Sequence, residues 1–366
     1  MKRLDSLTSL RFFAAFAVLA LHLSGYLPLV PAIEHASRLG YVGVGFFFTL
    51  SGFVLVWSSR PGDTPRAFYI RRFARVWPAH AVMTFAVIPL LLIQGDSPLW
   101  AALPFVLLLL QAWIPNGAWL GAFNTQSWSL SCEAFFYAAF PLLVVAAGWP
   151  RRRVRNAAAA VAAAAALVAL AVVVATPDAW WGYLLYVNPM YRVAEFALGM
   201  AVAIAVGRGW RPRWRVWHAA VLVVAIYVFV TVAAPRDSTG SVPLFVADLA
   251  LLPGFLALIA ACAWSDLQLR RSMLRHRSLV VLGEWSFALY LVHVFVIKAA
   301  WLLFADAGWS RATWTAVAAV VALLSIGCAG TLYSVVERPV ERYIRTRYAS
   351  RRRPDHQPAS ASARSA

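Results

Sequence analysis

The residues best suited to chemistry in this chain are titratable side chains that lie inside long apolar stretches. His22, Glu133 and His293 are the clearest cases. A titratable side chain is costly inside a lipid bilayer, so each one is a candidate for function. Imidazole and carboxylate groups can exchange protons with a substrate or pass protons along a path. These residues therefore indicate either acid–base catalysis or proton conduction.

A second group of candidates is basic. Arg71, Arg72 and Arg75 lie close together ahead of an apolar stretch, and Arg11 lies within the first apolar stretch. The guanidinium fork matches the oxygens of a phosphate, so this group is suited to a phosphate-rich ligand. Such a cluster more often serves only to orient a chain in the membrane, and that alternative stays open.

Spacing along the expected helices places four of the candidates at a similar depth. At about 1.5 Å per residue, His22 lies about 16 Å beyond Arg11 on the same helix. The same count, made from the ends of their own helices, brings Glu133, Arg192 and His293 near the level of His22, in the outer third of the membrane. We therefore expect these four side chains to converge.

Structural roles are the alternatives for the same residues. Arg192 could simply pair with Glu195 or with another carboxylate, and Glu133 could be a buried structural partner. His22 could likewise be a hydrogen-bonded structural histidine. His80 lies near the end of an expected helix, where we expect it to be solvated.

The composition explains why these side chains must lie in a membrane. The chain has 366 residues, of which 62% are hydrophobic and only 13% charged, and its mean hydropathy is +0.69. A soluble domain is nearer half apolar and a quarter charged. The net charge of +18 is gathered in short clusters between apolar blocks, which is typical of membrane topology and needs no nucleic-acid partner. Three cysteines in apolar runs give no disulfide or metal signal.

Ten apolar segments reach the roughly 20 residues that a membrane-spanning helix needs. An eleventh block, 98–113, is shorter and contains Pro104. With ten spans, every large Lys/Arg cluster falls on the side of the N-terminus, as the positive-inside rule requires. We therefore predict an all-α integral membrane protein with about ten transmembrane helices, a short re-entrant or interfacial segment at 98–113, and both termini in the cytoplasm. The spans begin near Leu7, Gly40, Val76, Ser127, Asn156, Val187, Val216, Pro243, Leu279 and Ala312.

The last residues differ in composition from the rest of the chain. Residues 349–366 are rich in Arg, Pro, Ser and Ala, which predicts a disordered basic cytoplasmic tail. Residues 1–348 form the expected transmembrane domain.

Six short motifs, ordered along nearly the whole chain, resemble those of acyltransferase family 3, the membrane-bound O-acyltransferases that modify bacterial glycans and some secondary metabolites. Any one motif would be weak evidence, but six in order are specific. They are Arg11 and His22 separated by ten residues, Gly43–Phe53, Arg72–Pro78, Trp128–Glu133 followed by Phe136–Tyr137, Ser286–His293, and Glu337–Pro339.

The resemblance implies a reaction and its partners. An acyl group would pass from cytoplasmic acyl-CoA, with acetyl-CoA as the favoured donor, to a hydroxyl of a glycan, a glycolipid or a macrolide-type acceptor. No metal is implied. The protein would reside in a bacterial inner membrane, in contact with the lipid bilayer.

The resemblance also implies roles for the candidate residues. His22 would act as the general base on the acceptor hydroxyl, because an alcohol is a poor nucleophile until a base removes its proton. Glu133 would orient the His22 imidazole, as a triad carboxylate does, and His293 would assist or contact the acceptor. The CoA phosphates would be held by Arg11, Arg71, Arg72 and Arg75.

Three further residues would contact the substrate. Tyr137 and Arg192 would donate hydrogen bonds to the developing oxyanion or to acceptor hydroxyls, and Ser131 would add a further contact. A covalent route through Ser129 or Ser131 is possible, although direct transfer is the simpler interpretation.

Two other classes of function remain open. A proton-coupled transporter of a small or glycosylated molecule would equally use buried His, Glu and Arg side chains. A non-catalytic membrane scaffold would leave those residues unexplained. Consumption of acyl-CoA by the purified protein would discriminate between these hypotheses.

Overall fold

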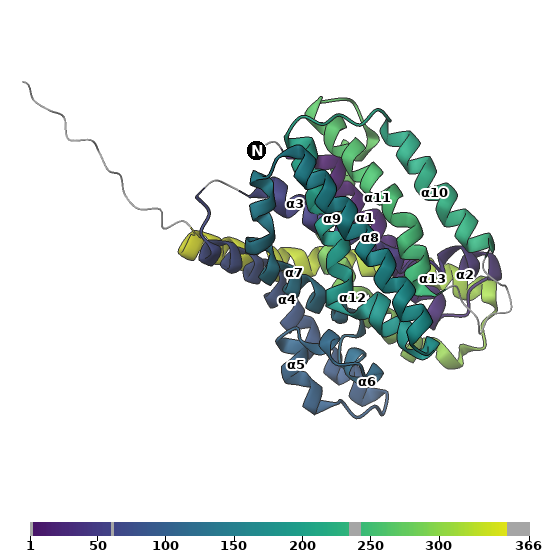
Figure 1. Ribbon diagram of the computed structural model, residues 1–366. Helices are drawn as coiled ribbons and strands as arrows, with labels where there is room; N and C mark the ends of the chain where they lie inside the picture. The colour runs from purple at the N-terminus through teal and green to yellow at the C-terminus, as the bar shows by residue number, and fades with distance from the viewer. Residues whose placement is uncertain (1–2, 60–61, 234–242, 350–366) are drawn as a thin grey trace, which may run out of the picture.

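The computed structural model describes residues 3–59, 62–233 and 243–349, and this part of the chain consists of helices joined by short loops, without a strand (Figure 1). Ten helical stretches in it are long and apolar enough to cross a membrane, which confirms the predicted fold class and span number. They contain α1 (Asp5–Tyr26), α2 (Pro31–Ser37) with α3 (Val42–Ser58), α4 (Pro65–Ile93), α7 (Trp128–Leu143), α8 (Arg151–Ala175), α9 (Pro189–Gly207), α10 (Val216–Ala233), α11 (Leu244–Leu267), α12 (Arg277–Phe304), and α13 (Arg311–Leu332) with α14 (Arg338–Ile344).

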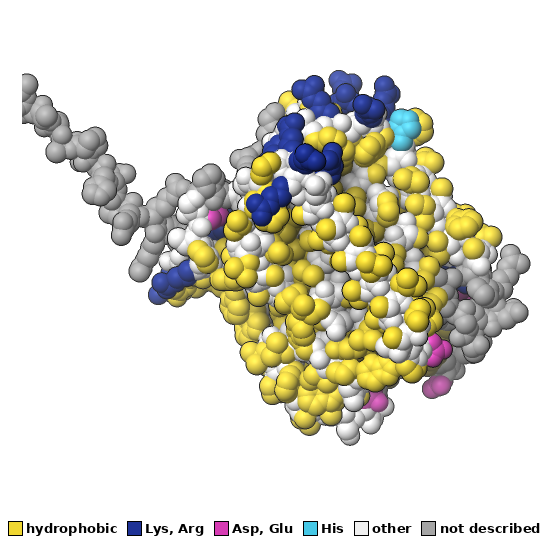
Figure 2. All heavy atoms as spheres, viewed as in Figure 1, with side chains coloured by type: hydrophobic (Ala, Val, Ile, Leu, Met, Phe, Trp, Pro, Cys, Tyr) yellow, Lys and Arg dark blue, Asp and Glu magenta, His cyan; other side chains and the backbone are white. Residues whose placement is uncertain are grey.

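The clusters of basic residues lie together at one end of the bundle, which we call the basic end. The starts of α1 and α12 meet there, where Arg3 is paired with Glu284 at 2.6 Å, and the end of α11 joins them through Asp266, which accepts hydrogen bonds from Ser6. The start of α8 meets the end of α9, where the Arg208 side chain donates to the carbonyl of Ala147. On the face shown in Figure 2, most of the Lys and Arg side chains lie at the upper end of the molecule, with a further group at its left edge.

Residues 98–113 form only short helical turns, so this block does not span a membrane. It contains the 3-10 turns Trp100–Ala102 and Gln111–Trp113 and α5 (Leu103–Leu107), and with α6 (Gly117–Leu120) it lies at the end opposite the basic end (Figure 1). His80 and Trp77 on α4 bind it, at 2.9 Å to the Val106 carbonyl and 3.0 Å to the Leu107 carbonyl. The expectation that His80 is solvated was wrong, because the ring is fully buried against this segment.

Two glycines allow α3 and α9 to cross at close range. A Cβ atom on Gly52 would overlap the backbone carbonyl of Phe196, and one on Gly199 would overlap that of Thr49. Small residues at a crossing let two membrane helices approach until their backbones touch. This crossing fixes α9 against α3 in the centre of the bundle, where both helices contribute side chains to the polar interior.

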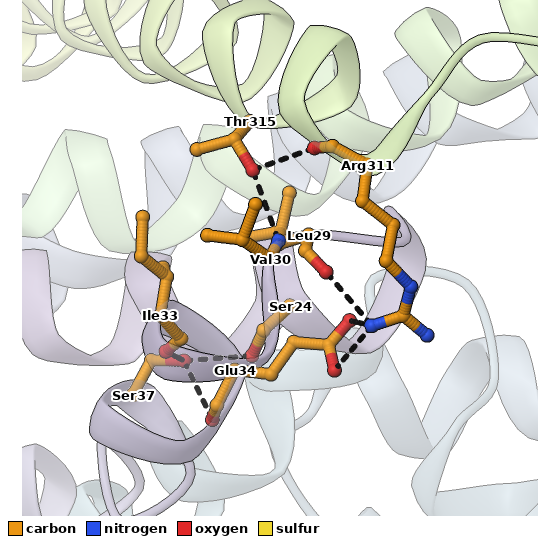
Figure 3. A network of polar contacts seen from close by, with 8 residues as sticks. All are labelled: Ser24, Leu29, Val30, Ile33, Glu34, Ser37, Arg311 and Thr315. Carbon is orange, nitrogen blue, oxygen red and sulfur yellow. Dashed lines mark hydrogen bonds and ion pairs between the residues drawn. The ribbon is translucent and has the colours of Figure 1, made fainter.

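A polar network fastens the loop after α1 to the start of α13 (Figure 3). The Arg311 guanidinium donates to the Leu29 carbonyl at 3.0 Å and to the Glu34 carboxylate at 3.2 Å. Thr315 accepts from the backbone amide of Val30 at 3.0 Å. These contacts hold the far end of α1, where His22 lies one turn before the helix ends, against α13.

Candidate active site

Two imidazole rings from distant parts of the chain meet inside the bundle. His22 on α1 and His293 on α12 lie with Nδ1 of His22 and Nε2 of His293 3.1 Å apart. Each ring also reaches the carbonyl four residues before it, His22 Nδ1 to Val18 at 2.9 Å and His293 Nδ1 to Leu289 at 3.0 Å. Of the four side chains that were expected to converge, these two meet.

The hydrogen bonds fix which nitrogens carry protons when both rings are neutral. A carbonyl oxygen only accepts, so Nδ1 of each ring must be the protonated nitrogen. His293 Nε2 is then an acceptor, and it shares the proton on His22 Nδ1 with the Val18 carbonyl. His22 Nε2 is left with a free lone pair, and no described residue is hydrogen-bonded to it. Because His293 is fully buried and His22 is not, His22 is the ring that a substrate can reach.

His22 opens into a cavity of about 500 Å³, which we call the outer cavity. Aromatic side chains make up much of its wall, namely Tyr41, Trp128, Tyr186 and Tyr290. Tyr290 lies one turn before His293 on α12, and its hydroxyl donates to the Gln126 carbonyl at 2.9 Å while Ser129 bonds to it at 2.7 Å. The position of Tyr290 in the Ser286–His293 motif was a signal that could have marked it as a site residue.

Asn124 and Gln126 hold α12 at the level of the paired rings. Both side-chain amides donate to the carbonyl of Leu291, at 3.1 Å and 2.8 Å. Both residues are almost fully buried, so these hydrogen bonds are shielded from water. They fix the backbone two residues before His293. Neither residue was among those predicted from the sequence.

Glu133 belongs to a different cavity from His22. Its carboxylate accepts a hydrogen bond of 2.6 Å from Tyr137, one turn further along α7. Glu133 and Tyr137 line a narrow space of about 110 Å³, the middle cavity, together with Arg11, Arg72 and Arg75. The side chain that hydrogen-bonds the His22 ring is thus His293, and the structure does not bring Glu133 into that role.

The arginines around the basic end differ in how they are paired. Arg75 is bound to the buried carboxylate of Glu337 and to Glu341, and Arg71 is paired with Asp63 at 2.8 Å. Arg11 and Arg72 have no carboxylate partner among the described residues. These two are therefore the guanidinium groups of the cluster that are available to a ligand.

A third cavity, the inner cavity, opens at the basic end. Its volume is about 650 Å³, and its wall includes Arg71 and Arg345. The inner and middle cavities adjoin, because Arg11, Leu55, Arg72 and Arg75 line both of them. The middle and outer cavities adjoin at Val44 and Tyr290, which line both. Three adjoining cavities thus lie in series between the unpaired arginines and His22.

Arg192 is enclosed by carboxylates at the centre of the bundle. Its guanidinium is fully buried and lies 2.7 Å from Asp248 and 2.9 Å from Glu195. The pairing with Glu195, which was the structural alternative for Arg192, is present. Asp248 was missed even though it lies within the apolar stretch that follows Pro243. The guanidinium also packs over the rings of Phe48 and Tyr186, so it supports the wall of the outer cavity from behind.

Ser131 faces the protein interior and not a cavity. Its hydroxyl donates to Gln111 at 2.8 Å and accepts from the backbone amide of Ala112, which anchors residues 98–113 to α7. Ser129, in contrast, lines the middle cavity next to Tyr290. Among the described residues, no group of His, Cys, Asp and Glu side chains is arranged to hold a metal ion.

A bundle of ten helices long and apolar enough to cross a membrane defines a multi-pass membrane protein. The chain belongs to acyltransferase family 3, since the family's acyltransferase domain matches residues 4–334. It is therefore an acyltransferase of the membrane.

Three curated proteins are similar to this chain. Acyltransferase MdmB of Streptomyces mycarofaciens is 37% identical, and the match covers 96% of this chain and 94% of that protein. Exopolysaccharide production protein ExoZ of Rhizobium meliloti is 29% identical over 86% of this chain and 93% of its own length. Peptidoglycan O-acetyltransferase OatA of Listeria monocytogenes is 29% identical over 40% of this chain and 25% of that protein. No solved structure gives a significant match.

Proposed function

We propose that this protein transfers an acyl group from acyl-CoA, with acetyl-CoA as the favoured donor, to a hydroxyl of a carbohydrate or related acceptor. The observation that carries the proposal is the series of adjoining cavities between the unpaired Arg11 and Arg72 and the free Nε2 of His22. The arginines suit the phosphates of CoA, and the long pantetheine arm suits the narrow middle cavity.

In this proposal His22 is the general base. Its Nε2 takes the proton of the acceptor hydroxyl while the hydroxyl oxygen attacks the thioester carbonyl. The carbon–sulfur bond then breaks, CoA leaves as the thiol after taking up that proton, and the acyl ester remains on the acceptor. Transfer is direct, without an acyl-enzyme, because Ser131 is turned away from the cavities and Ser129 is bound to Tyr290 and not to an imidazole.

His293 takes the part that a carboxylate plays in a catalytic triad. Its Nε2 accepts the hydrogen bond from His22 Nδ1, so together with the Val18 carbonyl it orients the ring with Nε2 free. Glu133 and Tyr137 are placed to bind the donor in the middle cavity together with Arg11, Arg72 and Arg75. Arg71 lies at the inner mouth.

The aromatic wall of the outer cavity favours a ring-shaped acceptor. Sugar rings present apolar faces that pack on Tyr and Trp side chains, and Tyr41, Trp128 and Tyr186 supply such surfaces around His22. OatA acts on peptidoglycan by its name, and ExoZ takes part in exopolysaccharide production. We infer a glycan or glycolipid hydroxyl as the acceptor, with a macrolide-type metabolite as the other candidate.

The sidedness follows from the charge rule. The basic end would face the cytoplasm of a bacterial cell, with both termini on that side, and His22 would be reached from the opposite face of the inner membrane. Most of the predicted tail, residues 350–366, lies outside the described residues.

The test is release of CoA by purified protein supplied with acetyl-CoA and glycan acceptors. His22→Gln is expected to lower turnover about 100-fold or more, because a general base contributes at least that factor. His276→Gln, at an exposed position, is the matched control and should retain turnover. Turnover that survives His22→Gln would disprove the role of His22. Transport of a glycosylated substrate without any use of acyl-CoA would instead establish the transporter hypothesis.

A further inference from the structure

A second basic site lies outside the three cavities. A groove of about 960 Å³ runs between α8 and α9 at the basic end and shares no lining residue with the inner, middle or outer cavity. We call it the α8–α9 groove. Apolar side chains from both helices line it. Five arginines also line it, namely Arg151, Arg152, Arg155, Arg208 and Arg211.

The groove has the length of one membrane leaflet. It extends along α9 from Leu198 to Arg208, which is about 15 Å of helix at 1.5 Å per residue. Half of a hydrocarbon core of about 30 Å is the same length. The floor is formed by small or aliphatic side chains such as Ala158, Ala201 and Val202, which leave room for hydrocarbon chains against the helix backbones.

The charge above the groove is uncompensated. No Asp or Glu lines the groove, and none of its five arginines has a carboxylate partner in the described part of the chain. Arg208 donates to the Ala147 carbonyl and Arg211 lies over the Trp264 ring, so both are held in place at the upper rim. Arg151 and Arg155 are exposed and lie one turn apart on α8.

We propose that the α8–α9 groove binds an anionic phospholipid of the adjacent leaflet, with the phosphate among the arginines and the acyl chains along Ala158, Ala201 and Leu198. Basic pockets between membrane helices recognise anionic headgroups in this way. The site suits both the phosphate and the acyl chains of such a lipid, since the arginines match a phosphate and the apolar floor matches hydrocarbon chains. The proposal is independent of acyl transfer.

The test is native mass spectrometry of the full chain with added phosphatidylglycerol or phosphatidylcholine. The double variant Arg151→Gln/Arg155→Gln is expected to weaken phosphatidylglycerol binding about 25-fold, since each arginine near a membrane surface contributes about fivefold. The matched control is Arg153→Gln/Arg213→Gln. It removes the same charge from the same end, but Arg153 stacks on Trp149 and neither residue lines the groove.

A second variant separates the lipid from a free anion. Ala201→Trp keeps all five arginines but fills the apolar part of the groove. It should therefore weaken the binding of phosphatidylglycerol and leave the binding of glycerol phosphate unchanged. An unchanged melting temperature shows that each variant is folded.

Four results would overturn the proposal. Phosphatidylcholine could bind as well as phosphatidylglycerol, or the control double variant could lose as much affinity as the test variant. The groove could be covered by a second copy of the chain, seen as a dimer that excludes lipid. Acyl-CoA could compete at the groove, which would assign the arginines to the donor.

Discussion

The direction of the hydrogen bond between His22 and His293 decides what each ring can do. Both Nδ1 atoms face carbonyl oxygens, so the neutral pair leaves one free lone pair on the accessible ring, at His22 Nε2. His293 is fully buried, and in the proposed mechanism it acts through His22 as a positioning residue.

We predict that His293→Leu lowers turnover about 100-fold, because the His22 ring loses the side chain that helps to orient it and keeps only the Val18 carbonyl as acceptor for its Nδ1 proton. His293→Gln should recover a large part of that loss, since its side-chain oxygen can still accept from His22 Nδ1. CoA release by both variants checks this prediction, with the melting temperature as the measure of folding. Equal activity of the Leu and Gln variants would show that only the volume of the ring matters.

Sequence spacing could not have identified His293, and not Glu133, as the side chain that hydrogen-bonds His22. Counting residues gave Glu133 and His293 similar depths, but a depth count contains neither the tilt of a helix nor the face on which a side chain lies. Glu133 shares a face of α7 with Tyr137 and meets the arginine cluster, whereas His293 faces α1. Asp248 was missed for a simpler reason, since a single carboxylate near the start of an apolar stretch resembles an interfacial residue.

At the scale of the helices, the crossing of α3 and α9 depends on glycines at the contact. We predict that Gly199→Ala lowers the free energy of unfolding by about 1–3 kcal/mol, because the new methyl group would overlap the Thr49 backbone and force the helices apart. Gly327→Ala on α13 is the matched control. No atom lies within 4 Å of its added Cβ, so stability should stay the same or rise by up to about 1 kcal/mol.

Thermal unfolding in one detergent compares the two variants directly. A smaller loss of stability for Gly199→Ala than for Gly327→Ala would contradict the close crossing.

The number of helices was predictable because length and hydropathy are properties of each segment alone. Their pairing was not, since Gly199 meets the backbone of Thr49 on a helix that is distant in the sequence.

At the scale of the whole molecule, the proposed function requires donor binding and proton transfer at opposite ends of one series of cavities. Arg72 lies at the basic end without a carboxylate partner, and His22 lies in the outer cavity. A residue that binds only the donor affects KM, whereas a base that acts in the transition state affects kcat.

We therefore predict that Arg72→Gln raises the KM for acyl-CoA about tenfold with kcat near that of the wild type, the size of effect expected from one charge-assisted hydrogen bond to phosphate. His22→Gln should show the opposite pattern, with a low kcat and an unchanged affinity for acyl-CoA. Arg213→Gln, an exposed change of the same charge at the same end, is the control. Arg75→Gln should differ from Arg72→Gln by costing about 3 kcal/mol of stability, because it leaves the buried Glu337 carboxylate without its nearest partner.

Steady-state kinetics over a range of acyl-CoA concentrations separates the effects of Arg72→Gln and His22→Gln on KM and kcat. A common fall in kcat for both variants would show that the two ends do not have separate roles.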